Sequence, residues 1–248
     1  MPLTGKLLEV ARTHPGRVAI ASGGQRLGYA QLVEDSRRLM AAVREVQAGQ
    51  RQPPEPVAET GGIPIVAVSV ASAFEAARIL AGLAGYRCVS ATIDPRWPLA
   101  HRVNVVRSAG IGVVVSDSAD LGEGLRAAGW RGTVLAPAAL HALESDAEPA
   151  EAPAVRDGRE PFLMLFSSGT TRNPKAFLKT RRQYRENYAV SAAYLEPLPG
   201  VATLAPGPVS YSLTLYAVIE CLASGGSAYL ADAFDPIRAA QTIAECRI

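Results

Sequence analysis

The sequence contains few of the residues from which disulfide frameworks and metal centres are built. Its 248 residues include only three cysteines and three histidines. Cys88, Cys221 and Cys246 are odd in number and far apart, which argues against a disulfide framework. The histidines have no metal-ligand spacing to these cysteines, so a zinc site is not expected. We interpret the cysteines as small buried residues of a protein in a reducing compartment.

Long hydrophobic runs and an excess of one charge are also absent. The longest apolar run, residues 63–74, is shorter than the roughly 20 residues that a membrane-spanning helix needs. The segment 1–17 is interrupted by charges and contains no apolar core of a signal peptide. The formal net charge of +2 is too small to indicate binding to nucleic acid or to an anionic membrane. We therefore expect a cytoplasmic protein with no membrane span and no nucleic-acid partner.

The residues that are present follow the pattern of an α/β fold. Hydrophobic residues make up 48% of the chain, and short apolar runs alternate with segments of helical periodicity. The predicted strands are 64–70, 87–93, 112–116, 133–135 and 161–165. The predicted helices are 3–13, 29–46, 73–82, 99–109, a helix beginning at 180, and 239–248. Segments 18–22 and 25–27 are predicted to form a hairpin around Gly23 and Gly24.

The most informative segment follows the strand at 161–165. It reads Phe166-Ser167-Ser168-Gly169-Thr170-Thr171-Arg172-Asn173-Pro174-Lys175. Backbone N–H groups and Ser or Thr hydroxyls at the end of a strand can donate to phosphate oxygens, and a lysine adds a fixed positive charge. The P-loop pattern G-x-x-x-x-G-K-[ST] cannot be laid on this segment. The segment therefore indicates a polyphosphate site of another kind.

With three further segments, this loop resembles the AMP-forming adenylating enzymes, the superfamily of acyl-CoA synthetases, peptide-synthetase adenylation domains and luciferases. The other segments are 27–32 (LGYAQL), 93–98 (IDPRWP, followed by Arg102) and 207–213 (GPVSYSL), in the family's order. The continuation Pro174-Lys175-Ala176-Phe177 is similar to that of bacterial acyl-CoA synthetases. The resemblance implies an α/β fold made of the layered β-sheet and helix subdomains of the family's large N-terminal domain.

The resemblance also implies a reaction in two displacements. A carboxylic acid attacks the α-phosphorus of ATP and gives an acyl-adenylate and pyrophosphate, after which the thiol of CoA or of a carrier protein takes the acyl group and releases AMP. The implied phosphate-binding residues are Ser167, Ser168, Gly169, Thr170, Thr171, Arg172 and Lys175. Lys175 is the expected catalytic residue, because its charge would lie near the leaving pyrophosphate. Thr171 would contact Mg²⁺, and Ser210, Tyr211 and Ser212 would begin the acyl pocket.

Two residues depart from the family's pattern. Arg172 stands where the family usually has glycine, so either the loop follows another path or the guanidinium adds a phosphate contact; an inactive, degraded loop is the third reading. Tyr211 stands where related acyl-CoA synthetases tend to carry histidine. It would change the shape of the acyl pocket, or it is an ordinary core residue.

A basic run follows the loop. Its members are Lys175, Lys179, Arg181, Arg182 and Arg185. The run is either a solvated helix face or a field that draws ATP or CoA phosphates toward the loop. Thr180 is the expected N-cap of the helix in this run.

The resemblance covers the whole chain but only about half of the family's length. We therefore expect an N-terminal portion of an acyl-CoA synthetase, inactive by itself, that can self-associate through its truncated face. Its expected parts are an N-terminal α/β part at 1–142, an acidic Ala/Pro-rich loop at 143–160, and an incomplete part at 161–248 with the phosphate-loop strand and the start of the acyl pocket. The alternatives are an adenylation domain that loads a carrier protein and a non-catalytic nucleotide-binding or interaction module.

Overall fold

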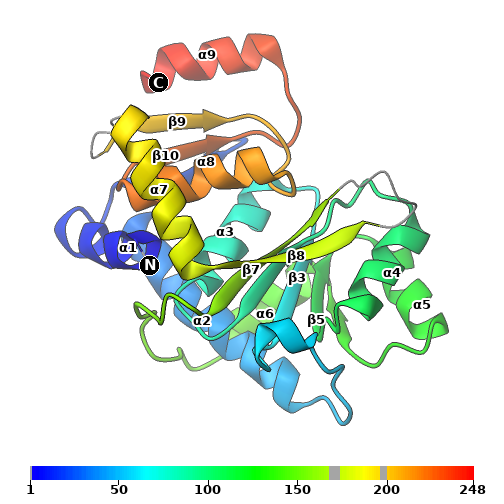
Figure 1. The fold of residues 1–248 in the computed structure, drawn as a ribbon. Helices are drawn as coiled ribbons and strands as arrows, with labels where there is room; N and C mark the ends of the chain where they lie inside the picture. The colour runs from blue at the N-terminus through cyan, green and yellow to red at the C-terminus, as the bar shows by residue number, and fades with distance from the viewer. Residues whose placement is uncertain (1, 168–173, 196–199) are drawn as a thin grey trace.

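The chain forms a mixed α/β structure with two sheets (Figure 1). The computed structural model describes residues 2–167, 174–195 and 200–248. The α/β fold class predicted from the sequence is confirmed. Among the described residues, no helix is long and apolar enough to cross a membrane.

The larger sheet has six strands in the order β6-β5-β3-β4-β7-β8. These strands are β3 (Ile65–Ser69), β4 (Val89–Thr92), β5 (Val113–Ser116), β6 (Thr133–Leu135), β7 (Pro161–Ser167) and β8 (Lys175–Thr180). Neighbouring strands are parallel except for β7 and β8, which are antiparallel. The carboxyl ends of β3, β4, β5 and β7 therefore lie at the same edge of the sheet.

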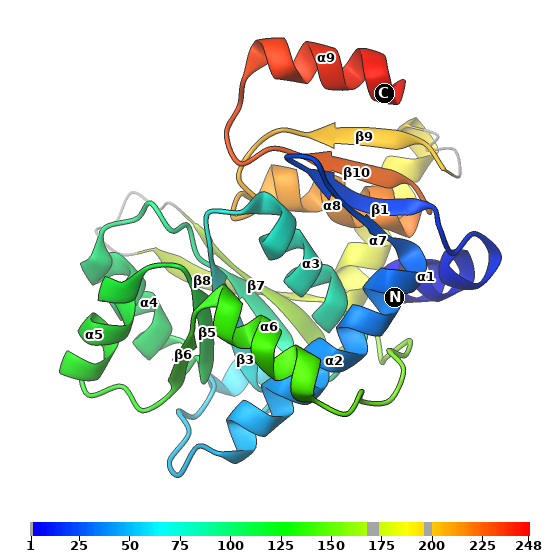
Figure 2. The same ribbon diagram turned by 180° about the vertical axis from the view of Figure 1, so that it is seen from behind.

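Helices cover both faces of this sheet. The α-helices of the described residues are α1 (Pro2–Thr13), α2 (Tyr29–Ala48), α3 (Ala73–Leu83), α4 (Leu99–Ser108), α5 (Ala119–Ala127), α6 (Pro137–Asp146), α7 (Arg181–Leu195), α8 (Ser212–Ala223) and α9 (Pro236–Cys246). A short 3₁₀ helix spans Ala58–Thr60. Figures 1 and 2 show α4 and α5 on one face and α2, α3 and α6 on the other.

The central strand β3 is a continuous apolar run because both of its faces are buried. Ile65 and Ala67 belong to the core shared with α4 and α5. Val66 and Val68 belong to the larger core shared with α2 and α3. This burial explains why the apolar run alone identified β3 as a buried strand.

The smaller sheet joins the two ends of the sequence. Its order is β2-β1-β10-β9, with β1 (Val18–Ser22), β2 (Gln25–Gly28), β9 (Ala202–Ala205) and β10 (Ser227–Leu230). The buried hydroxyl of Tyr29 donates to the carbonyl oxygen of Gly226 at 2.6 Å, and the Ser227 hydroxyl donates to the carbonyl oxygen of Val18 at 2.6 Å. Both sheets thus contain strands from before residue 142 and from after residue 161 (Figure 2).

Two local predictions from the sequence are confirmed. β1 and β2 form an antiparallel hairpin, and its turn residues Gly23 and Gly24 have φ of 56° and 88°, the positive values that a two-residue hairpin turn requires. Thr180 caps α7: its Oγ1 accepts from the Gln183 N–H at 3.3 Å, while the Gln183 Oε1 accepts from the Thr180 N–H at 2.9 Å. This reciprocal pair is a capping box.

The structure also contains elements that were not predicted from the sequence. They are α5, α6, α8, β8, β9 and β10. The segment 143–160 was expected to be a loop throughout, but α6 continues to Asp146. The helix predicted at 239–248 begins earlier, with Asp235 as its N-cap and Pro236 in the first turn, where the missing N–H of proline is tolerated.

Candidate functional site

Hydroxyl side chains line the edge at which the parallel strands end. β3, β4, β5 and β7 each finish with a hydroxyl residue: Ser69, Thr92, Ser116 and Ser167. Parallel α/β sheets bind ligands outside this edge, near the point where successive connections leave in opposite directions. That point lies between β3 and β5, because β3 connects to β4 on one side and β5 connects to β6 on the other. This row was not predicted, although a hydroxyl after each apolar run was its visible signal in the sequence.

The predicted phosphate segment leaves the same edge. Ser167 is the last residue of β7 and Lys175 is the first residue of β8, and the two are partners in the antiparallel ladder. The Ser167 hydroxyl lies 3.5 Å from the carbonyl oxygen of Lys175, and the Lys175 side chain is exposed. The other predicted phosphate-binding residues, Ser168, Gly169, Thr170, Thr171 and Arg172, lie outside the described residues.

A cavity of about 100 Å³ lies at the carboxyl ends of β3 and β4; we call it the edge cavity. Its apolar lining residues are Val68, Val70, Ala71, Ala73, Ala76, Leu80, Ile93, Pro95, Pro208 and Val209. Its polar lining residues are Thr92, Asp94, Arg96, Ser210 and Asp232. Segments that are distant in sequence therefore converge on one small, largely apolar space.

Two residues that line the edge cavity carry a buried hydroxyl with no protein partner. Thr92 Oγ1 on β4 and Ser210 Oγ on the segment before α8 are both buried without a hydrogen bond. Leaving a buried hydroxyl unpaired costs roughly 1–3 kcal/mol. The edge cavity therefore favours an occupant that brings a hydrogen-bonding atom to its apolar wall.

A charged bridge lies on the side of the edge cavity where the exposed Arg96 lines it; we call this side the cavity mouth. Arg96 donates from Nε and Nη2 to the buried carboxylate of Asp94 at 2.9 and 2.8 Å, and from Nη2 to the Tyr211 hydroxyl at 2.9 Å. Burial would raise the pKa of Asp94, but the hydrogen bonds and charge of Arg96 hold it below its usual value. The Arg96 guanidinium also lies 5.3 Å from the centroid of the Tyr211 ring, within cation–π range.

The three predicted acyl-pocket residues have different surroundings. Ser210 lines the edge cavity. Tyr211 is half-exposed and reaches the cavity mouth through Arg96. Ser212 is exposed and begins α8, away from the cavity lining.

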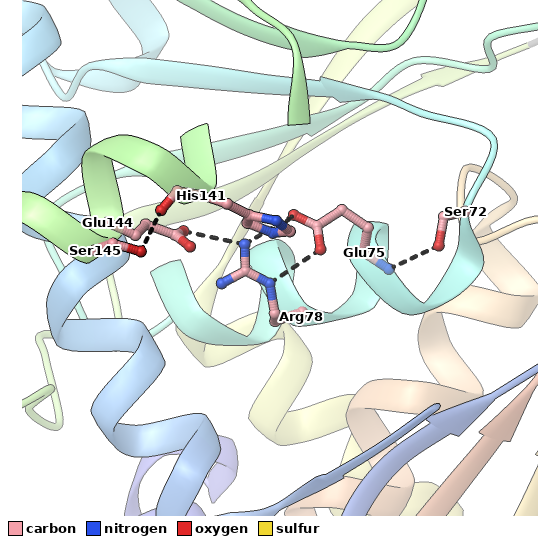
Figure 3. Close-up of polar contacts among 6 residues, drawn as sticks. All are labelled: Ser72, Glu75, Arg78, His141, Glu144 and Ser145. Atoms are coloured by element: carbon pink, nitrogen blue, oxygen red, sulfur yellow. Dashed lines mark hydrogen bonds and ion pairs between the residues drawn. The ribbon is translucent and has the colours of Figure 1, made fainter. Parts of the chain in front are cut away.

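Helix α3 forms one wall of the edge cavity, and the opposite face of the helix contacts α6. Ala73, Ala76 and Leu80 face the cavity, and the Asp232 carboxylate accepts from the Ala73 N–H at 2.7 Å. On the opposite face of α3, the buried Arg78 donates to Glu75 at 2.8 Å and to Glu144 of α6 at 3.0 Å (Figure 3).

His141 of α6, whose side chain is half-exposed, contacts the outer side of this cluster. Its Nε2 lies 3.1 Å from Glu75 Oε1 (Figure 3). Ion pairs therefore hold α3 against α6 on the side away from the cavity. No signal in the sequence predicted this cluster.

The interpretation of the basic run requires a correction at Arg181. Its side chain is 1% exposed, so it belongs neither to a solvated helix face nor to a field that attracts phosphates. It donates to the carbonyl oxygens of Ala84 and Tyr86 and lies 5.4 Å from the centroid of the Phe162 ring. Lys175 and Lys179 belong to β8 rather than to a helix.

The described residues contain no group of three or more His, Cys, Asp or Glu side chains that could hold a metal ion. Thr171, the residue expected to contact Mg²⁺, lies outside them.

The comparisons with known proteins agree with this geometry. Residues 7–248 match the family of AMP-binding enzymes. The chain belongs to this family.

The acyl-CoA ligase YhfT of Bacillus subtilis (strain 168), described as uncharacterized, is 26% identical over 247 residues, which are 100% of this chain and 48% of YhfT. The chain thus spans about half the length of the curated relatives it matches.

Solved structures share the fold. The N-terminal domain of FACL13 from Mycobacterium tuberculosis superposes with a TM-score of 0.83 at 21% identity, over 99% of this chain and 61% of that one. The o-succinylbenzoate CoA synthetase MenE from Bacillus subtilis, solved with its acyl-adenylate intermediate, gives a TM-score of 0.82 at 16% identity, over 99% and 60% of the two chains.

Proposed function

We propose that this chain is the N-terminal portion of an AMP-forming acyl-CoA ligase. In the first step, an oxygen of the substrate carboxylate attacks the α-phosphorus of ATP. The bond from that phosphorus to the oxygen that bridges it to the β-phosphorus breaks, and pyrophosphate leaves. In the second step, the sulfur of CoA attacks the acyl carbon, the thiol loses its proton, and AMP leaves with the electrons of the broken bond.

The observation that carries this proposal is the position of Ser167 and Lys175. They face each other across the β7–β8 ladder, at the edge where the parallel strands end, and they flank the segment with the remaining predicted phosphate-binding residues. The hydroxyls of Ser167, Ser168, Thr170 and Thr171 would donate to the β- and γ-phosphates, and Gly169 would let the backbone approach. Arg172 and Lys175 would add positive charge near the leaving pyrophosphate.

Magnesium enters the proposal only through Thr171. The chemistry that Mg²⁺ would supply is charge neutralisation on the phosphates. No step is derived through it, since the described residues offer no carboxylate or histidine set for it.

The acid would lie in the edge cavity. The cavity opens at the same edge as the phosphate segment, and Ser210 lines it. The names of YhfT as an acyl-CoA ligase and of MenE as a CoA synthetase favour CoA as the thiol. Because the chain spans about half of YhfT, we propose that residues 1–248 alone do not complete the reaction.

The test is acid-dependent exchange of labelled pyrophosphate into ATP by the protein that contains this chain. Lys175→Ala should slow this exchange about ten- to a hundredfold, because a charge-assisted contact contributes roughly 1.5–3 kcal/mol. Lys179→Ala is the matched control, because Lys179 is the other lysine of β8 and pairs with Leu163, away from the phosphate segment. The exchange rate of this control should stay within about twofold of the unaltered protein's, as expected for a surface substitution within about 0.5 kcal/mol.

Two outcomes would contradict the proposal at different levels. If no carboxylic acid supports exchange by the unaltered protein, the proposed function is wrong. If exchange occurs but Lys175→Ala matches Lys179→Ala, then Lys175 has no role in the first step.

A further inference from the structure

We propose that the edge cavity selects short acyl groups that carry an uncharged hydrogen-bonding group, such as a hydroxy or keto acid, with Thr92 and Ser210 as the specificity-determining residues. This inference rests on the proposed function and adds a substrate class to it. Size, polarity and charge of the cavity each support it.

The size of the edge cavity limits the length of the acyl group. Its volume is about 100 Å³, whereas an apolar cavity of about 150 Å³ accommodates benzene. The space therefore fits a group of fewer non-hydrogen atoms than benzene has. Its walls are packed against the core, since Ala73 and Ile93 are buried and Arg78 of α3 is paired with α6.

The polarity of the edge cavity specifies the chemistry of that group. Thr92 Oγ1 and Ser210 Oγ are buried, unpaired, and come from separate segments that both line the cavity. Thr92 is 4% exposed, so solvent does not satisfy it from outside. A hydroxyl or carbonyl oxygen on the acyl group would pair with these hydroxyls, whereas a saturated chain would leave them unpaired.

The charges around the edge cavity disfavour a second carboxylate on the substrate. The positive charge of Arg96 is already bound by Asp94. The amino-terminal end of α3 would attract an anion, but the Asp232 carboxylate already accepts from the Ala73 N–H. A second carboxylate on the substrate would be repelled by Asp232, and Arg96, the nearby cation, is already paired with Asp94. An uncharged polar group is therefore preferred.

The bridge between Arg96 and Tyr211 sets the upper limit on length. It joins the segment after β4 to the segment before α8 across the cavity mouth. Tyr211→Phe keeps the ring but removes the hydroxyl that accepts from Arg96. This change should loosen the mouth and improve the kcat/KM of longer acids relative to short ones.

The experiment compares acids in pyrophosphate exchange by the protein that contains this chain. The probes are 3-hydroxybutyrate, butyrate, succinate and decanoate. We expect the kcat/KM for 3-hydroxybutyrate to exceed that for butyrate and succinate by about tenfold or more, because a site built to bind a hydroxyl rejects analogues without it. Decanoate should be the poorest substrate.

The variants assign this preference to the two hydroxyls. Thr92→Val and Ser210→Ala should each lower the kcat/KM for 3-hydroxybutyrate more than that for butyrate and so remove most of the preference. Ser90→Ala is the matched control, because Ser90 is buried on β4 two residues before Thr92 but does not line the edge cavity. It should leave the preference unchanged.

The results distinguish an error in the proposed substrate class from an error in the proposed function. Preference for butyrate, succinate or decanoate, or an unchanged preference in Ser210→Ala, would overturn the substrate class while leaving adenylation intact. Exchange with none of the acids would overturn the proposed function instead. If Thr92→Val fails to fold, Ser210→Ala decides, because Ser210 lies on a partly exposed segment outside the sheet.

Discussion

At the scale of single residues, Arg181 shows how a charged side chain can be part of the core. It follows Thr180 in a run of basic residues, yet its side chain is almost fully buried. Its guanidinium satisfies the carbonyl oxygens of Ala84 and Tyr86, and Glu160 lies 3.6 Å from its Nε. Burial lowers the pKa of Arg181 to about 10, so the side chain still carries its charge at neutral pH.

We expect Arg181→Met to lower the free energy of unfolding by roughly 2–4 kcal/mol, because buried carbonyl groups lose a charged donor. The matched control is Arg182→Met, since Arg182 is the next residue on α7 and its side chain is 60% exposed. Its effect should lie within about 0.5 kcal/mol. Urea unfolding of both variants measures the difference, and equal midpoints would show that Arg181 does not stabilise the core.

At the scale of secondary-structure elements, the contact between α3 and α6 is an ionic one inside the protein. Arg78 is paired with two carboxylates, Glu75 and Glu144. The burial of Glu144 raises its pKa from the ordinary 4.5, against the opposing charge and hydrogen bond of Arg78. Burial therefore disfavours the anionic form of Glu144.

Substitutions at Arg78 and at Glu144 should have different effects on the free energy of unfolding. Arg78→Met leaves two buried carboxylates without their cation and should destabilise the protein by about 3–5 kcal/mol. Glu144→Gln keeps an acceptor for Arg78 and removes a charge that burial disfavours, so at pH 7 it should be neutral or stabilising. A strong loss of stability in Glu144→Gln at pH 7, measured by urea unfolding, would contradict this account.

The pH dependence follows from the direction of the Glu144 shift. A carboxyl group with a raised pKa in the folded state binds more protons there than in the unfolded state. Its stabilising contribution is complete below pH 4.5 and is lost as the pH rises through the folded-state pKa. The unaltered protein should therefore gain stability relative to Glu144→Gln as the pH falls from 7 toward about 4.5.

Elements differ in how well the sequence predicted them, and burial explains most of the difference. β3 and β5 were predicted because their residues are apolar on both faces. β8 was missed, because its residues are exposed or half-buried and include two lysines. β9 is only partly buried and contains two alanines, so its pattern carries little strand signal.

The candidate site was predicted unevenly for a different reason. The phosphate segment is continuous in sequence, so its chemistry was visible as a motif. The edge cavity combines residues from four segments, near Ala73, Thr92, Ser210 and Asp232, and the α3–α6 contact joins residues 66 positions apart. The fold brings these residues together, so no local sequence pattern predicts such sites.

At the scale of the whole molecule, the labelling rates of the cysteine thiols measure how often the protein unfolds. Cys88 and Cys221 are buried, and burial raises the pKa of their thiols to about 12 and about 11. Cys246, on α9, is partly exposed. Because only the thiolate reacts, native protein should label quickly at one thiol and slowly at the other two.

Mass spectrometry after a pulse of a maleimide reagent measures this pattern. Protein unfolded in urea should label at all three cysteines, and Cys246→Ser should remove the fast phase alone. Rapid labelling of Cys88 in native protein would show that the sheet around β4 opens without global unfolding.

Exposed apolar side chains should affect the association of residues 1–248. Large apolar side chains are exposed near the C-terminal end of the described chain: Leu213 is 84% exposed, Ile237 70% and Phe234 66%. Helix α9 contributes no buried residue, and Figure 1 shows it lying over β9, at the rim of the smaller sheet. Exposed apolar side chains can serve as contact sites between proteins, so we expect these side chains to promote self-association.

Sedimentation velocity of residues 1–248 should accordingly show concentration-dependent species larger than the 26.1 kDa monomer. The double variant Leu213→Asp and Ile237→Asp should shift the distribution to monomer, because a charge at an apolar contact adds a desolvation cost. Val155→Asp is the control, since Val155 is similarly exposed at 60% but lies in the segment between α6 and β7. It should leave the distribution unchanged. A monomer at all concentrations, or equal effects of Val155→Asp and the double variant, would show that the C-terminal apolar side chains do not drive association.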